Sequence, residues 1–540
     1  MRTTKLTGLC LFVLAIVVPT QIAADGFTNE ENWSAFDAGA IGGEITRGYF
    51  GAAFDGRHIY FAPCRTNTFH GIALRYDTQN DFKNSSSWES YDAGQIDGLD
   101  TKGYAGAIFD GTFVYYVPFC TMSGRHGRVM RYDPLGSFSS ATSWQAFDAD
   151  PLIGLPTSGF SGGVYDGRYI YFAPFGYDPI AHGHVLRYDT QGSFKQTQSW
   201  SVYDASFTDG LNTRGYYGAG FDGRYVYFVP FNDGSDYHGR TLRYDTQGTF
   251  SSPSSWSAYD AGNTEGQITV GYKGAVVSGD YVFFVPFRDA SVRHGRVLRY
   301  DRKGDFHMSS SWSAYDAGNI GGMSTRGYVG AELAGKYIYF VPYSGDGNIY
   351  HARMLRYDTS APFKTASSWS AYDAGSTDGM TTKGYKFSAC DGQYVYFTPY
   401  HNNINFSGIA LRYRLPGEPI PDIKANGSDG PVTIKQSDVL NLEVALNPND
   451  APVVDYDWWI LADTAFGWYS YRMSTHSFVP GLAVTHQGQL FAFGPNTVFS
   501  GANLPVGSYE FFFGVDAQMN GVPDMNVMYL DSVGVTVTRL

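Results

Sequence analysis

Short runs in which apolar and polar residues alternate cover most of the chain, and turn residues separate them. In the segment 214–261, four such runs follow one another: RGYYGAGFD, RYVYFVPF, GRTLRYDT and SSWSAYDA. A period of two residues is typical of β-strands that bury one face. The segment therefore predicts a four-stranded antiparallel unit.

This unit recurs along the chain, and tryptophan is its clearest marker. Seven tryptophans follow one another at spacings of 55 to 57 residues, each within a phrase like SWSAYDAG: Trp33, Trp88, Trp144, Trp200, Trp256, Trp312 and Trp369. Self-similarity at a fixed period indicates a repeat architecture, and four strands in each repeat are typical of a propeller blade. The sequence predicts an all-β, seven-bladed β-propeller over residues 27–415.

The turns and the ends of the repeats support this fold. In five repeats an Asp-Gly dipeptide separates the first two strands, which favours a two-residue hairpin in which these residues adopt positive φ angles. The repeats begin with a lone fourth strand at 33–37, whereas the last repeat has only three strands and ends at SGIALRYRL, 407–415. We expect the N-terminal strand to complete the last blade, because this removes an open sheet edge.

The phrases GYxGAxFDGRYVYF, LRYD and SW resemble the blade of kelch-type propellers, with a glycine-rich inner strand, an aromatic second strand and a tryptophan in the outer strand. The resemblance covers roughly residues 30–415 and departs from the family in lacking the paired glycines of a kelch repeat. It implies a fold and does not choose a function, because kelch-like propellers include both enzymes and binding proteins.

A different composition follows the repeats. The stretch 416–430 is rich in proline and glycine and predicts a linker, and residues 431–540 alternate again and predict a small β-sandwich. The phrase LPVGSYEFFFGV, 504–515, resembles the Leu-x-x-Gly-x-Tyr turn of immunoglobulin-like domains. The aromatic cluster around Trp458, Trp459 and Trp468 resembles modules of bacterial secreted proteins and implies an adhesive or targeting role; core packing is the alternative.

The N-terminal residues have the layout of a secretory signal peptide. Arg2 and Lys5 precede an apolar run that ends at Val18, and small residues follow up to Ala24. We predict a signal peptide over 1–24 and a secreted or periplasmic protein. No later apolar stretch is long enough to cross a bilayer, so no membrane span is predicted.

Charge and cysteine content narrow the function classes. The net charge is −13 and the basic residues do not cluster in runs, which argues against general nucleic-acid binding. Cys64, Cys120 and Cys390 remain after cleavage, too few for a disulfide-built fold. Cys64 and Cys120 lie at similar places in neighbouring repeats, which leaves one bridge or two buried thiols open.

Comparison of the repeats with one another separates structural from variable positions. What every blade shares is expected to hold the blade, and what differs is available for a site. The phrase Arg-Tyr-Asp occurs six times, and we predict that its arginine pairs with the aspartate two residues later on one strand face. The arginines are Arg75, Arg131, Arg187, Arg243, Arg299 and Arg356.

Two sets of loops are expected around the mouth of the central channel. One carries a basic residue followed by tyrosine, as in Arg214 and Tyr216. The other carries histidine in six repeats: His70, His126, His182, His238, His294 and His351. Equivalent positions on separate blades lie around a ring and do not converge on a metal. For each histidine, a hydrogen-bonding role within the turn is the alternative to ligand binding.

The loops of blades three to five differ most from the others, which predicts a ligand site off-centre in the mouth. The planar guanidinium group of arginine can donate two hydrogen bonds to a carboxylate or sulfate group, and aromatic rings stack on sugar faces. We therefore predict binding of an extracellular polysaccharide, with a surface protein as the other partner class. The candidate ligand-binding residues are Arg214, Tyr216, His238, His182, Tyr177, His184, Arg288 and His294.

A polysaccharide lyase is the alternative function, because the mouth resembles in residue type that of seven-bladed propeller lyases acting on uronate polymers. β-Elimination needs a cation, a base and an acid, roles open to Arg, His and Tyr, but no lyase motif matches residue by residue. Hydrolysis would need two carboxylates at the mouth, for which only scattered candidates exist: Asp178, Asp289 and Asp346.

The sequence implies no cofactor apart from one calcium alternative. Oxygen-bearing side chains at alternating positions resemble the start of a calcium loop: Asp516, Gln518, Asn520 and Asp524. The twelfth position of that loop is Val527, which supplies no carboxylate, so we interpret the segment as a structural turn.

Overall fold

The computed structural model describes residues 26–176, 181–449, 451, 455–517, 519–523 and 528–539. The predicted signal peptide, 1–24, lies outside the described residues, as do Tyr177, Asp178, Gln518, Asp524 and Val527. Glu30–Leu415 and Pro416–Leu540 belong to two different compact units. Among the described residues, no helix is long and apolar enough to cross a membrane.

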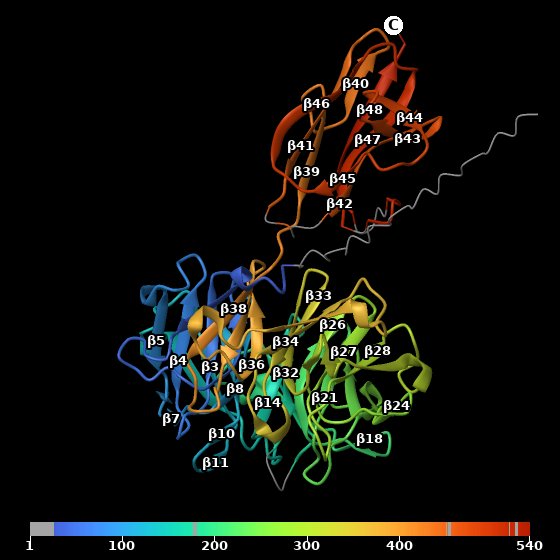
Figure 1. The fold of residues 1–540 in the computed structure, drawn as a ribbon. Coiled ribbons are helices and arrows are strands. Elements are labelled where there is room, and N and C mark those ends of the chain that lie inside the picture. The colour runs from blue at the N-terminus through green and yellow to red at the C-terminus, as the bar shows by residue number, and fades with distance from the viewer. Residues whose placement is uncertain are drawn as a thin grey trace, which may run out of the picture. The chain divides into compact units, whose positions relative to one another are not determined.

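Repeated four-stranded antiparallel sheets form the first unit, and we call each sheet a blade (Figure 1). The described residues give seven such sheets, numbered here in chain order. Their strands are β2 (Tyr49–Phe54), β3 (His58–Pro63), β4 (Ile72–Asp77) and β5 (Trp88–Asp92); β8 (Tyr104–Phe109), β9 (Val114–Pro118), β12 (Arg128–Tyr132) and β13 (Trp144–Asp148); β14 (Phe160–Tyr165), β15 (Tyr169–Pro174), β16 (His184–Asp189) and β17 (Trp200–Asp204); β20 (Tyr216–Phe221), β21 (Tyr225–Pro230), β22 (Arg240–Asp245) and β23 (Trp256–Asp260); β26 (Tyr272–Ser278), β27 (Tyr281–Pro286), β28 (Arg296–Asp301) and β29 (Trp312–Asp316); β32 (Tyr328–Ala334), β33 (Tyr337–Pro342), β34 (Arg353–Asp358) and β35 (Trp369–Asp373); and β36 (Tyr385–Cys390), β37 (Tyr394–Pro399), β38 (Ile409–Arg414) and β1 (Trp33–Asp37).

Short elements connect these strands. Single 3-10 turns precede the outer strands: Glu30–Asn32, Ser85–Ser87, Ala141–Ser143, Thr197–Ser199, Pro253–Ser255, Ser309–Ser311 and Ala366–Ser368. Two further 3-10 turns are Asp346–Asn348 and Thr377–Gly379. Two-stranded hairpins are β6 (Gln95–Ile96) with β7 (Leu99–Asp100), β10 (Cys120–Thr121) with β11 (Gly124–Arg125), β18 (Phe207–Thr208) with β19 (Leu211–Asn212), β24 (Asn263–Thr264) with β25 (Gln267–Ile268), and β30 (Asn319–Ile320) with β31 (Met323–Ser324).

The blades close into a ring, as the sequence predicts. The first strand of each blade contacts the first strand of the next, and β36 of the last blade contacts β2 of the first. The N-terminal strand β1 pairs with β38, with Trp33 opposite Tyr413 and Asp37 opposite Ile409. The predicted all-β propeller fold and its closure by the N-terminal strand are therefore confirmed.

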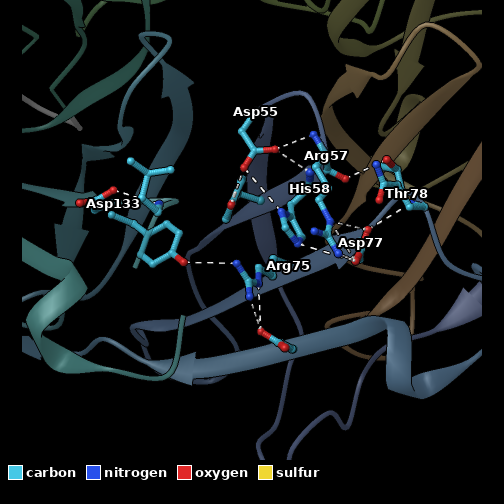
Figure 2. A network of polar contacts seen from close by, with 12 residues as sticks. Asp55, Arg57, His58, Arg75, Asp77, Thr78 and Asp133 are labelled. Atoms are coloured by element: carbon cyan, nitrogen blue, oxygen red, sulfur yellow. Dashed lines mark hydrogen bonds and ion pairs between the residues drawn. The ribbon is translucent and has the colours of Figure 1, made fainter. Parts of the chain in front are cut away.

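The Asp-Gly turns form hairpins by a different arrangement from the predicted one. In blade 1, Gly56 adopts a φ of 100°, whereas Asp55 is not among the residues with positive φ. Asp55 instead accepts hydrogen bonds from the backbone N–H groups of Arg57 and His58, at 2.7 and 2.6 Å (Figure 2). The aspartate thus holds the turn through its side chain, and the glycine alone supplies the left-handed backbone.

The predicted pairing of the Arg-Tyr-Asp arginine with its own aspartate is wrong. In blade 1, Arg75 Nη2 lies 2.7 Å from Glu89 Oε2, while Asp77 pairs with Arg57 (Figure 2). The Arg75 guanidinium also lies 4.7 Å from the centre of the Phe138 ring in the next blade. Stacking on an aromatic face is favourable for a guanidinium, so this arginine joins neighbouring blades.

The repeated tryptophans are buried between blades. Trp256 is 4% exposed, and its indole N–H donates to the carbonyl of Phe250 at 2.9 Å. Its ring stacks on Tyr203 of the preceding blade with ring centres 4.6 Å apart. Each outer strand therefore contributes a large apolar side chain with its polar group satisfied.

The second unit is a β-sandwich. One sheet orders β39 (Ile420–Ala425), β41 (Leu440–Asn447) and β46 (Phe493–Gly501); the other orders β40 (Val432–Lys435), β48 (Tyr529–Thr538), β47 (Gly507–Asp516), β42 (Asp455–Thr464), β43 (Gly467–Arg472) and β44 (Ser477–Pro480), and β45 (His486–Gln489) also pairs with β42. Buried residues of both sheets form one hydrophobic core. Trp459 is fully buried and Trp458 is 6% exposed, which agrees with core packing.

The predicted linker 416–430 contains a strand that sequence reasoning missed. β39 occupies residues 420–425 and pairs with β41, with Pro421 opposite Leu446. Because β39 is the edge strand of its sheet, the proline removes no hydrogen bond that the sheet interior needs. Proline in the segment was therefore a poor sign of a linker.

Candidate functional site

The predicted histidines hold the backbone of the loops. His238 is 2% exposed, its Nε2 lies 2.8 Å from the carbonyl oxygen of Arg214, and its Nδ1 accepts the N–H of Arg240 at 3.2 Å. A carbonyl can only accept, so Nε2 carries the proton and the ring is neutral. Equivalent bonds join His70, His126, His182, His294 and His351 to the preceding loop.

Burial keeps these rings neutral. It lowers the pKa of His238 to about 3, and the nearby Arg240 guanidinium acts in the same direction. The pKa values of His182 and His294 are lowered to about 3 for the same leading reason. With both nitrogens bonded to backbone, these three candidates have a structural role, which is the alternative that the sequence left open.

The other candidates are placed in different surroundings. Tyr216 is fully buried and donates to the carbonyl of Arg240 at 3.1 Å. The Arg214 guanidinium lies 5.1 Å from the centre of the Phe207 ring, and His184 Nδ1 lies 2.8 Å from the carbonyl oxygen of Pro156. Tyr177 lies outside the described residues. Of the described candidates, Arg288 is the one that lines the cavity introduced next.

A cavity of about 740 Å³ occupies the mouth of the channel. Its floor comes from the residue that follows the tyrosine or phenylalanine at the start of the first strands. The seven blades have at this position Phe50, Ala105, Ser161, Tyr217, Lys273, Val329 and Lys386, of which Phe50, Tyr217, Lys273 and Lys386 line the cavity. Its wall is the residue after the proline that ends each second strand: Cys64, Phe119, Phe175, Phe231, Phe287, Tyr343 and Tyr400.

A β-bulge aims the floor residues at the channel. In blade 5 the register between β26 and β27 shifts between Tyr272 and Ala275, so Lys273 and Gly274 have no partner in the ladder. The same shift occurs in blade 7 between Tyr385 and Ser388. A bulge redirects a side chain out of the regular alternation, and here it turns both lysines toward the mouth.

The two lysines are surrounded by aromatic rings. Lys386 is 7% exposed, and its Nζ lies 3.7 Å from the centre of the Tyr400 ring and 4.0 Å from that of Phe50. Lys273 Nζ lies 4.1 Å from the ring centres of both Tyr217 and Phe287. Aromatic faces attract a cation electrostatically, and this attraction offsets part of the free energy lost when the cation is removed from water.

Neither lysine has a counter-ion among the described residues. Lys273 and Lys386 make no hydrogen bond or ion pair with them, and no described residue that lines the cavity is acidic. Burying an ammonium without a partner is costly, so this arrangement disfavours the charged form. Burial lowers the pKa of Lys386 to about 7 and holds the pKa of Lys273 well below its ordinary value.

Arginines add further positive charge around the cavity. Arg293 is 9% exposed, its guanidinium lies 4.1 Å from the centre of the Phe287 ring, and Nη2 donates to Asn348 Oδ1 at 2.6 Å. Arg288 lies 5.0 Å from the centre of the Tyr237 ring. Together with Arg65, they line the same cavity. The cavity is therefore cationic and aromatic although the whole chain is acidic.

The channel is closed below this cavity. In blades 1 to 6 a glycine follows the floor residue, and these glycines form a ring so tight that a Cβ added at Gly51 would lie 2.9 Å from the Cα of Gly106. Blade 7 has Phe387 there, at a φ of 57°. Its ring lies inside the ring of blades, with its centre 5.9 Å from that of Phe50 in the neighbouring blade 1 and 6.3 Å from that of Tyr217 in blade 4 across the channel.

The cysteines of the cavity are free thiols. Cys64 is buried and Cys120 half-buried, and both line the cavity without a disulfide. Burial raises the pKa of the Cys64 thiol to about 11, so it stays protonated near neutral pH.

The described part of the calcium alternative is organised by Asp457. Asp516 is buried opposite Asp457 in neighbouring strands, and Gly521 donates its N–H to Asp457 Oδ2 at 2.9 Å. Asn520 Oδ1 accepts the N–H of Val522 at 2.8 Å. Among the described residues, no group of three or more His, Cys, Asp or Glu side chains is placed to hold a metal ion.

Sequence reasoning missed the lysines, although a signal was present. At the floor position of the first strand the blades carry Phe, Ala, Ser, Tyr, Lys, Val and Lys. Variation between blades marks a candidate site position in a strand as it does in a loop, and here it points to Lys273 and Lys386. Comparison of the chain with models of protein families and with curated proteins gives no match.

Proposed function

We propose that this protein binds an acidic saccharide in the cavity at the mouth of the propeller channel. The observation that carries the proposal is the pair of lysines, Lys273 and Lys386, held in an aromatic cavity whose described lining residues include no carboxylate. A carboxylate or sulfate group would supply the missing counter-charge. The aromatic wall, which includes Phe231 and Tyr400, offers flat apolar faces of the kind on which sugar rings stack.

The predicted location and module types belong to the same proposal. The signal-peptide pattern at 1–24 supports a secreted or periplasmic protein, where polysaccharides are found. The repeat resembles kelch blades, and the second unit resembles an immunoglobulin-like module. In that unit Tyr509 Oη donates to the carbonyl of Pro505 at 2.7 Å, as a tyrosine does at a corner of immunoglobulin-like folds.

Calorimetric titration with oligouronates and with neutral oligosaccharides of equal length tests the proposal. We expect binding of the acidic series alone. The variant Lys386→Met should bind at least about tenfold more weakly, since a hydrogen bond to a charged group contributes about 1.5–3 kcal/mol. Lys303→Met is the control, because it removes one positive charge from a side chain that is 73% exposed and paired with Asp280. Equal binding of neutral and acidic chains would refute the proposal.

The pH dependence of binding gives an independent test. A bound anion favours protonated Lys386 and raises its pKa from about 7. Affinity for a carboxylate ligand should therefore be highest below about pH 7 and fall as the pH rises to about 8, because the lysine must take up a proton to bind. Titration in two buffers of different ionisation enthalpy should show this proton uptake. In Lys386→Met the uptake should decrease, because only Lys273 then remains to take up a proton.

A polysaccharide lyase is the second candidate, and one observation favours it. An amine with a pKa of about 7 is partly neutral at neutral pH, so Lys386 has the properties of a base that takes the C5 proton of a uronate. The centre of the Tyr400 ring lies 3.7 Å from Lys386 Nζ, which places a hydroxyl-bearing side chain nearby for protonation of the leaving oxygen, and the Arg293 guanidinium would neutralise the carboxylate. Ultraviolet absorbance of an unsaturated product during incubation with uronate polymers distinguishes lyase activity from binding alone.

A further inference from the structure

The shape of the cavity limits how a polymer enters it. Phe387 closes the channel beneath the floor: a Cβ added at Gly330 would lie 2.5 Å from its ring, and one added at Gly274 would lie 3.6 Å from it. A smaller cavity of about 140 Å³ lies against the glycine ring and Phe387. The large cavity is therefore open at one end, and a chain cannot thread through it.

Charge is distributed by depth within this closed cavity. Lys273 and Lys386 extend from the first strands next to the glycine ring, so they rise from the floor, and their ammonium groups lie between the rings of floor and wall residues. Arg65 and Arg288 come from the positions just after the wall residues Cys64 and Phe287, in the loops that follow the second strands, so they lie nearer the opening. A ligand must therefore bring an anionic group to the deepest point, where no protein carboxylate reaches among the described lining residues.

We infer that the cavity recognises the end of an acidic saccharide chain, with the acid group of the terminal unit at the floor between Lys273 and Lys386. This rests on the proposed function. An internal unit of a long polymer carries chain on both sides and cannot bring its acid group to a blind floor, whereas a terminal unit can. A volume of about 740 Å³ lies in the range that encloses most of a drug-sized ligand, which suits a short chain end.

The remaining cations fit the same arrangement. Arg288 and Arg293 reach the cavity beside Tyr237 and Phe287, above the floor. Their planar forks match a second carboxylate or sulfate, so the unit next to the terminal one is also expected to be acidic. The ligand class is thus a polyanionic chain that binds through its end.

The number of protein molecules bound to each chain tests the inference. We would titrate oligouronates of short and intermediate length and the long parent polymer, each of known chain concentration, and measure the molar ratio by calorimetry. End recognition gives one protein molecule per chain at every length. Recognition of internal units gives a ratio that rises in proportion to chain length, and that result would overturn the inference while leaving the proposed function standing.

A chemically modified chain provides the second arm. Amidation of the terminal carboxylate alone should weaken binding at least about tenfold, whereas amidation of a single internal carboxylate far from the end should leave it unchanged. In Lys386→Met the difference between the two modified chains should become smaller, because only Lys273 then meets the terminal carboxylate, and in the control Lys303→Met they should differ as in the unmodified protein. If no acidic chain of any length binds, the proposed function fails and this inference fails with it.

Discussion

The outer strands and the cavity floor belong to the same seven repeats, yet they follow opposite rules. Every outer strand begins with a buried tryptophan, whereas the floor position carries a different side chain in almost every blade. Outside, uniform side chains make neighbouring blades pack alike. At the floor, two lysines that have no counter-ion among the described residues break the symmetry. Repetition therefore marks the scaffold of this molecule, and its local failure marks the candidate site.

Closure of the ring is where the scaffold is expected to be most sensitive. Deleting residues 26–40 removes β1, which pairs with β38 along its whole length, and leaves blade 7 with an open edge and an unfilled face. We expect aggregation or a large drop in the thermal midpoint. Size-exclusion chromatography and calorimetry check this. A deleted protein that stays monomeric and melts like the parent would contradict the closure argument.

Acid should unfold the scaffold through its buried histidines. The pKa values of His182, His238, His294 and His351 are lowered to about 3, so these rings take up protons near pH 6.5 only when the chain unfolds. Their contribution is complete above about pH 6.5 and is lost as the pH falls toward 3, at up to about 1.4 kcal/mol per pH unit for each ring. The urea midpoint should drop clearly between about pH 7 and about pH 5. A flat midpoint in this window would mean that the rings are not held neutral.

Removing one tryptophan should have a smaller but clear effect. Trp256→Ala leaves a cavity between two blades and should cost about 3–5 kcal/mol of unfolding free energy. Leu135→Ala is the control, because that side chain is 95% exposed and its loss should change stability by no more than about 0.5 kcal/mol. Urea denaturation compares the two. Similar values for both variants would show that the outer strands do not carry the scaffold.

Two single substitutions with small expected effects on stability distinguish the scaffold from the cavity floor. His238→Ala leaves the Arg214 carbonyl and the Arg240 N–H without their partner and should cost about 1–3 kcal/mol while acidic oligosaccharides still bind. Lys386→Met removes a buried ammonium that has no counter-ion in the described part of the chain, so stability should stay unchanged or rise while binding weakens at least about tenfold. Loss of stability in Lys386→Met, with binding retained, would reverse the assignment of the two regions.

Sequence alone predicted the propeller because its information is local and repeated. Strand alternation, turn glycines and the tryptophan spacing all point to one unit, and the unmatched strands at 33–37 and 409–414 reveal the closure. In blade 5 the sequence also reflects the loss of one side-chain hydrogen bond. In blade 4 the Tyr227 hydroxyl donates a hydrogen bond to the turn aspartate Asp222 at 2.9 Å. Blade 5 has Ser278 in place of this aspartate and Phe283, which has no hydroxyl, in place of this tyrosine.

The site was less accessible to sequence reasoning for two physical reasons. The bulge at Lys273 interrupts the alternation of strand residues, so a strict period of two does not predict which way the Lys273 side chain points. The histidines have the right chemistry for a ligand, but whether a ring nitrogen meets a loop carbonyl depends on how neighbouring loops approach one another. The residue types at the mouth thus indicated a basic, aromatic site, but the structure was needed to identify the individual side chains that form it.

The pairing of β1 with β38 has a consequence for biosynthesis. Among the propeller strands, a ribosome makes residues 33–37 first and their partners at 409–413 last, so the earliest strand remains unpaired while almost the whole propeller emerges. Such a distant contact is costly to form, because a long loop must close before the pairing stabilises anything. A chain that stops before β38 keeps β1 unpaired and the ring open. Synthesis of the last propeller strand and completion of the ring therefore coincide, which leaves chains that stop before β38 recognisable to proteases by their exposed edges.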